Sequence, residues 1–239
     1  MLKRCGQAVL ADANLSIGEG VTALLGRNGA GKTTLIRALT GFLKPSAGEI
    51  LLDGRPLSTY SDRERAQKLA YVPQNPREGL FVTAAYFVAM GAFPNQSLFR
   101  TPGPARMRQA GEILFAMGLS QFAERGMDTL SGGETRLMYL ARAQMQGAEC
   151  FILDEPLAGL DYAWQHRFLE RLKREKRGVF LSLHDPSFAM QYADRIVLIA
   201  DGRLYENPRE ANLQAAYGRE LRLIEAENQK IAVWKGSST

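Results

Sequence analysis

A glycine-rich segment at residues 26–33 (GRNGAGKT) has the residue types that bind phosphate groups. Its glycines let the backbone wrap an anion with main-chain amides, and the following helix would present its positive N-terminal end to the same anion. We expect Lys32 to neutralise the β- and γ-phosphates of a nucleotide and the Thr33 hydroxyl to bind Mg²⁺. The residues assigned to nucleotide binding are Gly26, Arg27, Asn28, Gly29, Ala30, Gly31, Lys32, Thr33 and Thr34.

An apolar run at residues 150–153 ends in two adjacent carboxylates, Asp154 and Glu155. Successive residues at a strand end point in different directions, so the two side chains can take different roles. Asp154 can hold Mg²⁺ through water, and Glu155 can accept a proton from the water molecule that attacks the γ-phosphate. Such a run is common by itself, but together with a phosphate loop it indicates nucleotide hydrolysis.

A third segment, Leu130, Ser131, Gly132, Gly133 and Glu134, opens the helix that leads into that strand. One interpretation is a second anion-binding helix start. One protein cannot easily aim both helix starts at the same phosphate from opposite sides, so this interpretation requires a second subunit. The other interpretation is a simple serine N-cap followed by flexible glycines.

These segments must be held by a sheet with helices on it. Strand-like runs occur at residues 21–25, 49–52, 69–72, 151–153, 179–183 and 195–199, with helical patterns between several of them, which predicts an α/β fold with a mainly parallel sheet. Residues 195–199 and 203–205 bracket an Ala-Asp-Gly turn and predict a hairpin at the sheet edge. Residues 76–149 lack strand-like runs, and helices are predicted at 83–90, 104–117 and 132–146. We therefore predict one domain over 1–239, with a core of about 1–75 and 150–239 and a helical subdomain of about 76–149.

Composition narrows the class of protein only moderately. The chain has 239 residues, of which 46% are hydrophobic and 23% charged, as in ordinary globular domains, and no apolar stretch is long enough to cross a bilayer. A net charge of +5 is compatible with phosphate ligands, nucleic acid or an anionic membrane surface and separates none of them. The two cysteines and two histidines have no ligand spacing, so zinc and disulfide interpretations are discarded.

Taken together, the motifs and their order resemble the nucleotide-binding subunit of ATP-binding cassette (ABC) transporters, over nearly the whole chain. The resemblance implies a RecA-like core and a signature segment at 130–134 that contacts the ATP of a partner subunit. It also implies that Gln74 senses Mg²⁺ and the γ-phosphate, that Asp161 lies in a loop facing the dimer partner, and that His184 contacts the γ-phosphate. Catalysis would then rest on Glu155, His184 and Gln74, and Mg²⁺ binding on Thr33, Gln74 and Asp154.

The implied function is an ATP-hydrolysing subunit at the cytoplasmic face of the membrane, with ATP and Mg²⁺ as cofactors. Its expected partners are a second copy or a homologous ATPase subunit, transmembrane permease subunits and, through them, a substrate-binding protein; no nucleic-acid partner is expected. Residues 83–94 and 213–218 and Glu134 are similar to importers of iron-siderophore, haem and cobalamin complexes. Two alternatives stay open: an exporter or metal-ion importer, and a non-transport ABC ATPase acting on DNA or ribosomes.

The chain departs from the family pattern at two places. No aromatic residue precedes Phe42, so the ring that usually stacks on adenine is missing. Arg4 lies near the expected place and could cover the base through its planar guanidinium, but a shortened first strand with no base clamp fits equally. After the signature, the family's usual Gln-Gln-Arg is replaced by Thr135, Arg136 and Leu137.

Overall fold

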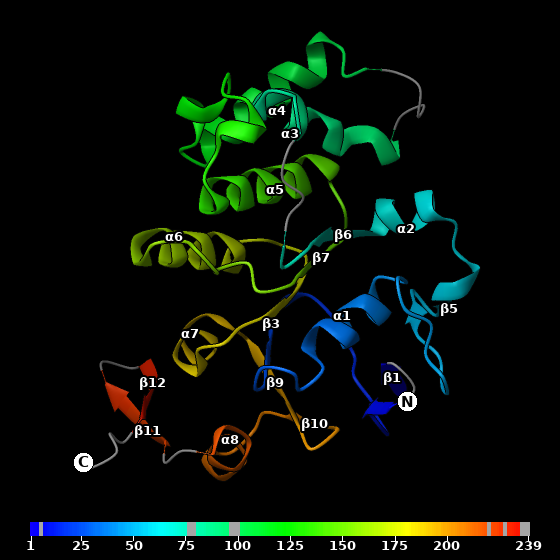
Figure 1. The fold of residues 1–239 in the computed structure, drawn as a ribbon, viewed down its shortest axis with the longest axis vertical. Helices are drawn as coiled ribbons and strands as arrows, with labels where there is room; N and C mark the ends of the chain where they lie inside the picture. Colours follow the sequence, from blue (N-terminus) through cyan, green and yellow to red (C-terminus); the bar gives the residue numbers. More distant parts are fainter. Residues whose placement is uncertain (5–6, 76–79, 96–100, 219–220, 227–228, 235–239) are drawn as a thin grey trace.

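The computed structural model describes residues 1–239 except 5–6, 76–79, 96–100, 219–220, 227–228 and 235–239. Its centre is a six-stranded sheet in the order β10-β9-β3-β8-β7-β6, parallel from β9 to β6 (Figure 1). The strands are β3 (Gly20–Leu25), β6 (Leu69–Val72), β7 (Cys150–Leu153), β8 (Gly178–Ser182), β9 (Arg195–Ala200) and β10 (Arg203–Glu206). β10 pairs antiparallel with β9, which confirms the predicted edge hairpin.

Both faces of the sheet are covered by helices, and residues along each strand alternate between two apolar cores. On β3, Leu24 packs in the core formed with α1 (Lys32–Leu39), whereas Ala23 and Leu25 belong to the core on the other face. That second core contains residues of α6 (Tyr162–Lys173), α7 (Pro186–Tyr192) and α8 (Glu210–Tyr217). This two-sided burial accounts for the nearly continuous apolar character of the central strands.

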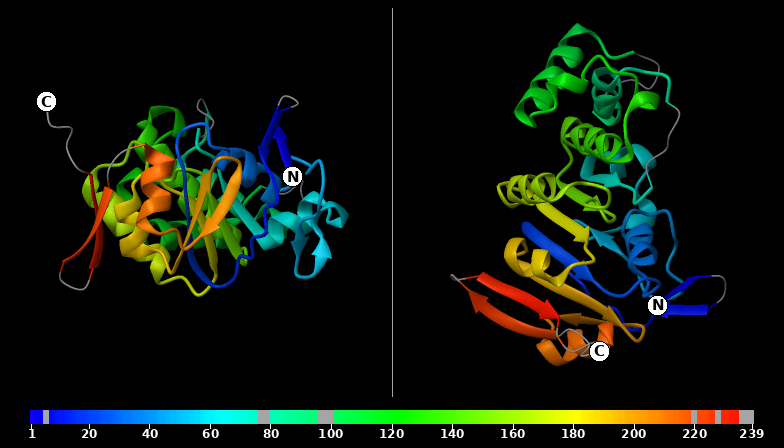
Figure 2. Two further views of the ribbon diagram at one scale, coloured as in Figure 1. Left: turned by 90° about the horizontal axis from the view of Figure 1, so that it is seen from below. Right: turned by 60° about the vertical axis from the view of Figure 1, so that its left-hand side comes forward.

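The helical part of the chain occupies one end of the molecule (Figure 2) and contains three helices close to the predicted positions, α3 (Ala84–Ala89), α4 (Pro104–Ala116) and α5 (Gly132–Gln146); it is called the helical subdomain below. Shorter 3-10 turns connect its helices: η2 (Met90–Asn95), η3 (Ser120–Phe122) and η4 (Met127–Thr129). The subdomain shares the larger core with the sheet, through residues such as Met138 on α5 and Leu153 on β7. Within the described part of the chain, no helix combines the length and apolar character that a membrane span requires.

The described residues also form three small two-stranded sheets outside the central sheet. β1 (Leu2–Arg4) pairs with β2 (Gln7–Leu10), and β11 (Leu221–Ala226) pairs with β12 (Gln229–Trp234) beside α7; neither pair was predicted from the sequence. Among the described residues, β4 (Leu51–Leu52) pairs with β5 (Arg55–Pro56) and with no strand of the main sheet, so the expectation that 49–52 is a strand of the main sheet was wrong. Asp53 and Gly54 both have positive φ and fold this run back on itself as a tight hairpin.

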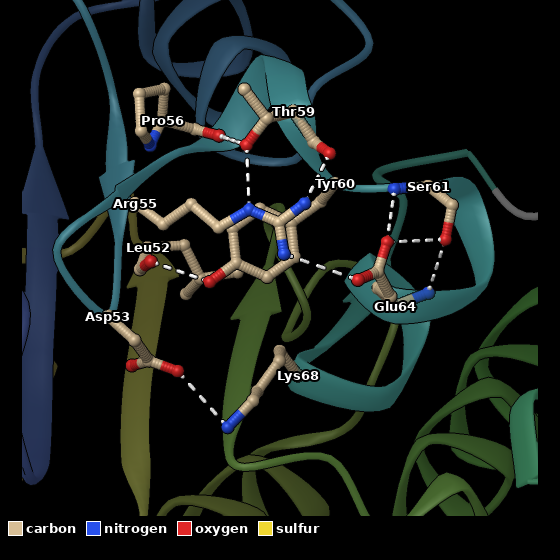
Figure 3. Close-up of polar contacts among 9 residues, drawn as sticks. All are labelled: Leu52, Asp53, Arg55, Pro56, Thr59, Tyr60, Ser61, Glu64 and Lys68. Atoms are coloured by element: carbon tan, nitrogen blue, oxygen red, sulfur yellow. Dashed lines mark hydrogen bonds and ion pairs between the residues drawn. The ribbon is translucent and has the colours of Figure 1, made fainter.

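A polar cluster after this hairpin fixes α2 (Asp62–Lys68), the helix that leads into β6 (Figure 3). Arg55 donates to the carbonyl of Thr59 at 2.6 Å, and its Nη1 lies 3.3 Å from Oε1 of Glu64. Glu64 and Ser61 cap the helix reciprocally, with Ser61 N 2.7 Å from Glu64 Oε2 and Glu64 N 3.2 Å from Ser61 Oγ. The 3-10 turn η1 (Leu57–Thr59) lies between this hairpin and the capped helix.

Candidate nucleotide-binding site

The glycine-rich segment forms the turn between β3 and α1, as predicted. Gly31 has φ 108° at the N-cap of α1, and a side chain there would collide with Cγ1 of Val9, so both backbone conformation and space require glycine. Lys32 is 5% exposed and its Nζ donates to the carbonyl of Gly26 at 2.8 Å. Arg27, Asn28 and Gly29 are exposed at the tip, and Thr34 is buried in the helix. The loop thus presents an accessible main chain around a nearly buried ammonium group.

Asp154 lies at the end of β7 and is completely buried. Its Oδ1 accepts a 2.8 Å hydrogen bond from Ser182 Oγ, whereas Oδ2 is buried with no described donor in hydrogen-bond geometry. Burial raises the pKa of this carboxyl, and interactions with Ser182 and Thr33 oppose the rise. An oxygen buried without a donor, close to a threonine hydroxyl, fits a cation such as Mg²⁺.

Glu155 is the meeting point of the predicted catalytic residues. Its Oε2 accepts a 2.6 Å hydrogen bond from Gln74 Nε2 and lies 2.8 Å from Nε2 of His184, while Oε1 lies 3.7 Å from Nζ of Lys32. Its backbone has φ 48°, and its amide donates to Ser182 Oγ at 2.8 Å. Three residues from three separate segments therefore converge on the carboxylate of Glu155, a residue that is 9% exposed.

Lys32 is the cation of this cluster. Burial lowers the pKa of its ammonium group, and the charges of Glu155 and Asp154 oppose that shift. The two carboxylates thus compensate a buried positive charge whose other partners are main-chain carbonyls. An incoming polyphosphate would offer the ammonium stronger acceptors than these carbonyls.

The signature segment forms the start of α5, and the same arrangement of a serine and a glutamate caps the start of α2. Ser131 N lies 2.7 Å from Glu134 Oε2 and Glu134 N lies 3.2 Å from Ser131 Oγ, the same distances as in the Ser61–Glu64 cap of Figure 3. Arg125 makes contacts like those of Arg55, because it donates to the carbonyl of Thr129 at 2.6 Å and lies 3.4 Å from the carboxylate of Glu134. The serine N-cap is therefore real. What distinguishes the signature is the glycine pair 132–133 where α2 has Asp62 and Arg63.

The two glycines of the pair differ in their surroundings. A Cβ atom at Gly133 would lie 2.7 Å from the carbonyl oxygen of Gly159, whereas nothing lies within 4 Å of one at Gly132. The start of α5 therefore rests directly on the loop that follows Glu155. Asp161, further along this loop, is the N-cap of α6 and accepts a 2.8 Å hydrogen bond from Trp164 N.

We expect Gly133→Ala to lower the free energy of unfolding by about 1–3 kcal/mol, because the new methyl group overpacks the contact with Gly159. Gly132→Ala is the matched control and should leave stability unchanged or slightly higher, since alanine favours helix and the site is open. Thermal and urea unfolding of the two variants check this difference. Equal stability of both variants would contradict the close packing of α5 on this loop.

Two residues of the site, Ser182 and Arg136, were given no role in the sequence analysis. Ser182 orients the Asp154 carboxylate, to which it donates, and holds the main chain at Glu155, from whose amide it accepts. Its place at the end of β8, next to β7 in the sheet, was the available signal. Arg136, noted only as a departure, reaches from α5 to the main chain at Gln74 and Ala158. The remaining prediction, Arg4, concerns a side chain that lies outside the described residues.

Comparison with known proteins decides the family. A family model described as ABC transporter matches residues 10–158. The chain belongs to the ABC transporter family. It is 36% identical over 206 residues to the cobalamin import ATP-binding protein of Halobacterium salinarum, an alignment that covers 84% of this chain but 51% of that relative. The chain thus spans about half the length of that protein.

Other ABC proteins match over more of their length. The hemin import ATP-binding protein of Burkholderia thailandensis is 36% identical over 250 residues, covering 91% of this chain and 90% of the relative. Among solved structures, a dimeric bacterial ABC transporter cassette superposes with a TM-score of 0.74 at 24% identity, covering 84% of this chain and 91% of that one. This likeness confirms the predicted fold of an ABC ATPase cassette, with its mostly parallel sheet and antiparallel edge.

Proposed function

We propose that this chain is the ATP-hydrolysing subunit of an ABC importer, which dimerises around two ATP molecules and drives transport through membrane partners. The observation that carries the proposal is the convergence of Lys32, Gln74 and His184 on the Glu155 carboxylate beside the phosphate loop. Phosphate-binding and proton-accepting groups are thereby placed in one small site. The family and the import proteins among its relatives support the same proposal.

In the proposed reaction the loop amides and Lys32 bind the triphosphate, and Glu155 accepts the proton of the attacking water. Gln74 and His184 fix the direction of the carboxylate, because both lie at its Oε2 atom. Ser182 holds the backbone at Glu155 and the side chain of Asp154 through one hydrogen bond to each. Thr33, Asp154 and Gln74 would hold Mg²⁺, which supplies charge neutralisation at the phosphates.

We propose that the signature residues Ser131 and Gly133 contact the ATP bound to a second cassette. Ser131 is exposed at the start of α5, and its cap bonds are made within its own chain. An exposed helix start with a glycine pair can face an anion brought by a partner. Asp161 lies in the loop on which this helix start packs, so the two segments would approach the partner together.

The proposed setting is the cytoplasmic face of a membrane, with permease subunits and a substrate-binding protein as partners. The proposed cargo class is an iron chelate, haem or a cobalamin-type compound, because relatives are named for the import of cobalamin and hemin and for siderophore transport. No contact in the described residues favours an exporter, a metal-ion importer, or an ATPase that acts on DNA or ribosomes. Genes for a polytopic permease and a secreted binding protein beside this one would support import, whereas their absence would count against it.

We expect Lys32→Ala to bind ATP about tenfold to a hundredfold more weakly, because a charge-assisted contact to the phosphates contributes about 1.5–3 kcal/mol. Lys44→Ala removes the same charge from an exposed position after α1 and should bind like the wild type. Titration with a fluorescent ATP analogue measures both, and phosphate release measures hydrolysis by the unmodified chain. The proposal is wrong if the wild type neither binds nor hydrolyses ATP.

A further inference from the structure

Arg136 joins three parts of the molecule that the mechanism uses separately. It lies in the second turn of α5, five residues after Ser131, and is 8% exposed. Its Nη2 donates to the carbonyl of Gln74 at 2.6 Å, and its Nη1 donates to the carbonyl of Ala158. One buried side chain of the helical subdomain thus bonds the main chain after β6 and the main chain after Glu155.

Both acceptors belong to loops of the candidate site. The Gln74 side chain, whose main chain Arg136 holds, donates to Glu155. Ala158 precedes Gly159, on whose carbonyl Gly133 rests, and the same loop continues to Asp161. The two contacts of α5 with this loop, at Gly133 and Arg136, lie one helical turn apart and fix the helix against it.

A guanidinium group is suited to this arrangement because its planar fork offers several donors in fixed directions. In the described structure both acceptors are carbonyl oxygens, and Nε has no partner. Burial lowers the pKa of Arg136, and the charge of Glu155 opposes the shift. A buried cation held only by carbonyls is a costly way to fix a helix, so a role beyond helix packing is expected.

We propose that Arg136 is a positioning residue that holds Gln74 against Glu155 and thereby ties the catalytic carboxylate to the signature helix. The inference rests on the proposed function and deepens it. A shift of α5 when Ser131 meets the partner's ATP would be passed through the guanidinium to Gln74 and to the loop of Asp161. Lysine at this position keeps the charge but cannot span both carbonyls with one planar group.

The test compares Arg136→Lys with Arg142→Lys in the purified full chain. Arg142 lies on the same helix, stacks 5.2 Å from the Phe87 ring centroid and has no described contact with either loop. We expect Arg136→Lys to reduce kcat for ATP hydrolysis about tenfold with KM within twofold, because misplaced catalytic groups cost rate while the phosphate loop is untouched. Arg142→Lys should keep kcat. Arg136→Gln, with one amide donor group, provides a second variant should lysine impair folding.

A double-mutant cycle separates positioning from general loss of structure. In a Gln74→Ala background, Arg136→Lys should lower kcat by less than a further threefold, since its effect acts through Gln74. A larger further loss overturns the proposal.

Hydrogen exchange of the nucleotide-free chain adds a readout that needs no turnover: Arg136→Lys should speed amide exchange at the main chain around residues 74 and 158–160, and Arg142→Lys should not. Unchanged exchange contradicts the positioning role whether or not the wild type hydrolyses ATP. Absence of turnover in the wild type, in contrast, contradicts the proposed function.

Discussion

Glu155→Gln should bind ATP like the wild type but hydrolyse it 10²- to 10⁴-fold more slowly, and an ATP-bound dimer should accumulate. Losing a general base costs about this factor, or about 3–5 kcal/mol of activation free energy. Glutamine keeps the size of the side chain and can still meet Gln74 and His184, but its amide cannot accept the proton. Single-turnover phosphate release measures the rate, and sedimentation measures the dimer.

Two features of the structure indicate that Glu155→Gln would still fold, so that unfolding would not explain a loss of ATP hydrolysis. The backbone at Glu155 has a left-handed φ of 48°, and the conformational strain there is about the same for glutamine as for glutamate. The 2.8 Å hydrogen bond from Lys32 to the Gly26 carbonyl does not involve Glu155 and should remain. Because Glu155→Gln removes one of the two charges that compensate Lys32 and leaves Asp154, thermal unfolding should show a variant that is somewhat less stable but still folded. Turnover within tenfold of the wild type would remove Glu155 from the role of base and leave its contacts with Lys32, Gln74 and His184 as structural ones.

Ser131→Arg should abolish the ATP-dependent dimer when it is introduced into the Glu155→Gln chain, which is expected to form that dimer most readily. Ser131 is exposed, so the isolated chain can accommodate arginine, but the added bulk would fill the space intended for the partner's phosphate. The substitution also removes a helix cap, which costs about 0.5–2 kcal/mol. Sedimentation with and without ATP measures the dimer, and nucleotide titration should show weak binding retained.

The similar cap at the start of α2 provides a control for the Ser131→Arg experiment. Ser61→Arg removes the same reciprocal bonds with Glu64 at the start of α2 and carries the same added charge (Figure 3). It should lose similar stability but keep the ATP-dependent dimer. A dimer that survives Ser131→Arg would mean that the signature serves only as a helix cap.

Much of the site could be predicted from sequence because its motifs are local. A glycine loop before Lys32 and carboxylates after β7 fall at the ends of parallel strands, and such strand ends gather on one edge of a sheet. The helical subdomain was predicted from the loss of strand-like runs, and its three helices begin and end within one or two residues of the predicted positions. The convergence of Gln74 and His184 on Glu155 was not predicted, since both were assigned to the γ-phosphate.

The parts that could not be predicted depend on distant packing. Arg136 donates to carbonyl groups 62 and 22 positions away in the chain. Because every residue has a main-chain carbonyl, the sequence does not indicate which of them accept a hydrogen bond. The run at 49–52 was misplaced because apolar residues occur in small hairpins as well as in central strands. Leu51 is 53% exposed there, which alternation in so short a run does not reveal.

The position of β6 has a consequence for the order in which the chain folds. In the described part of the chain β6 is an edge strand of the main sheet and pairs with β7 alone, and the helical subdomain lies between these two strands in the sequence. Closing a loop of that length costs entropy unless the intervening residues are already compact. The contacts among α3, α4 and α5 are local by comparison. The helical subdomain would therefore collapse early, and attachment of β6, which places Gln74 beside Glu155, would come late, so that catalytic competence appears only at the final stage of folding.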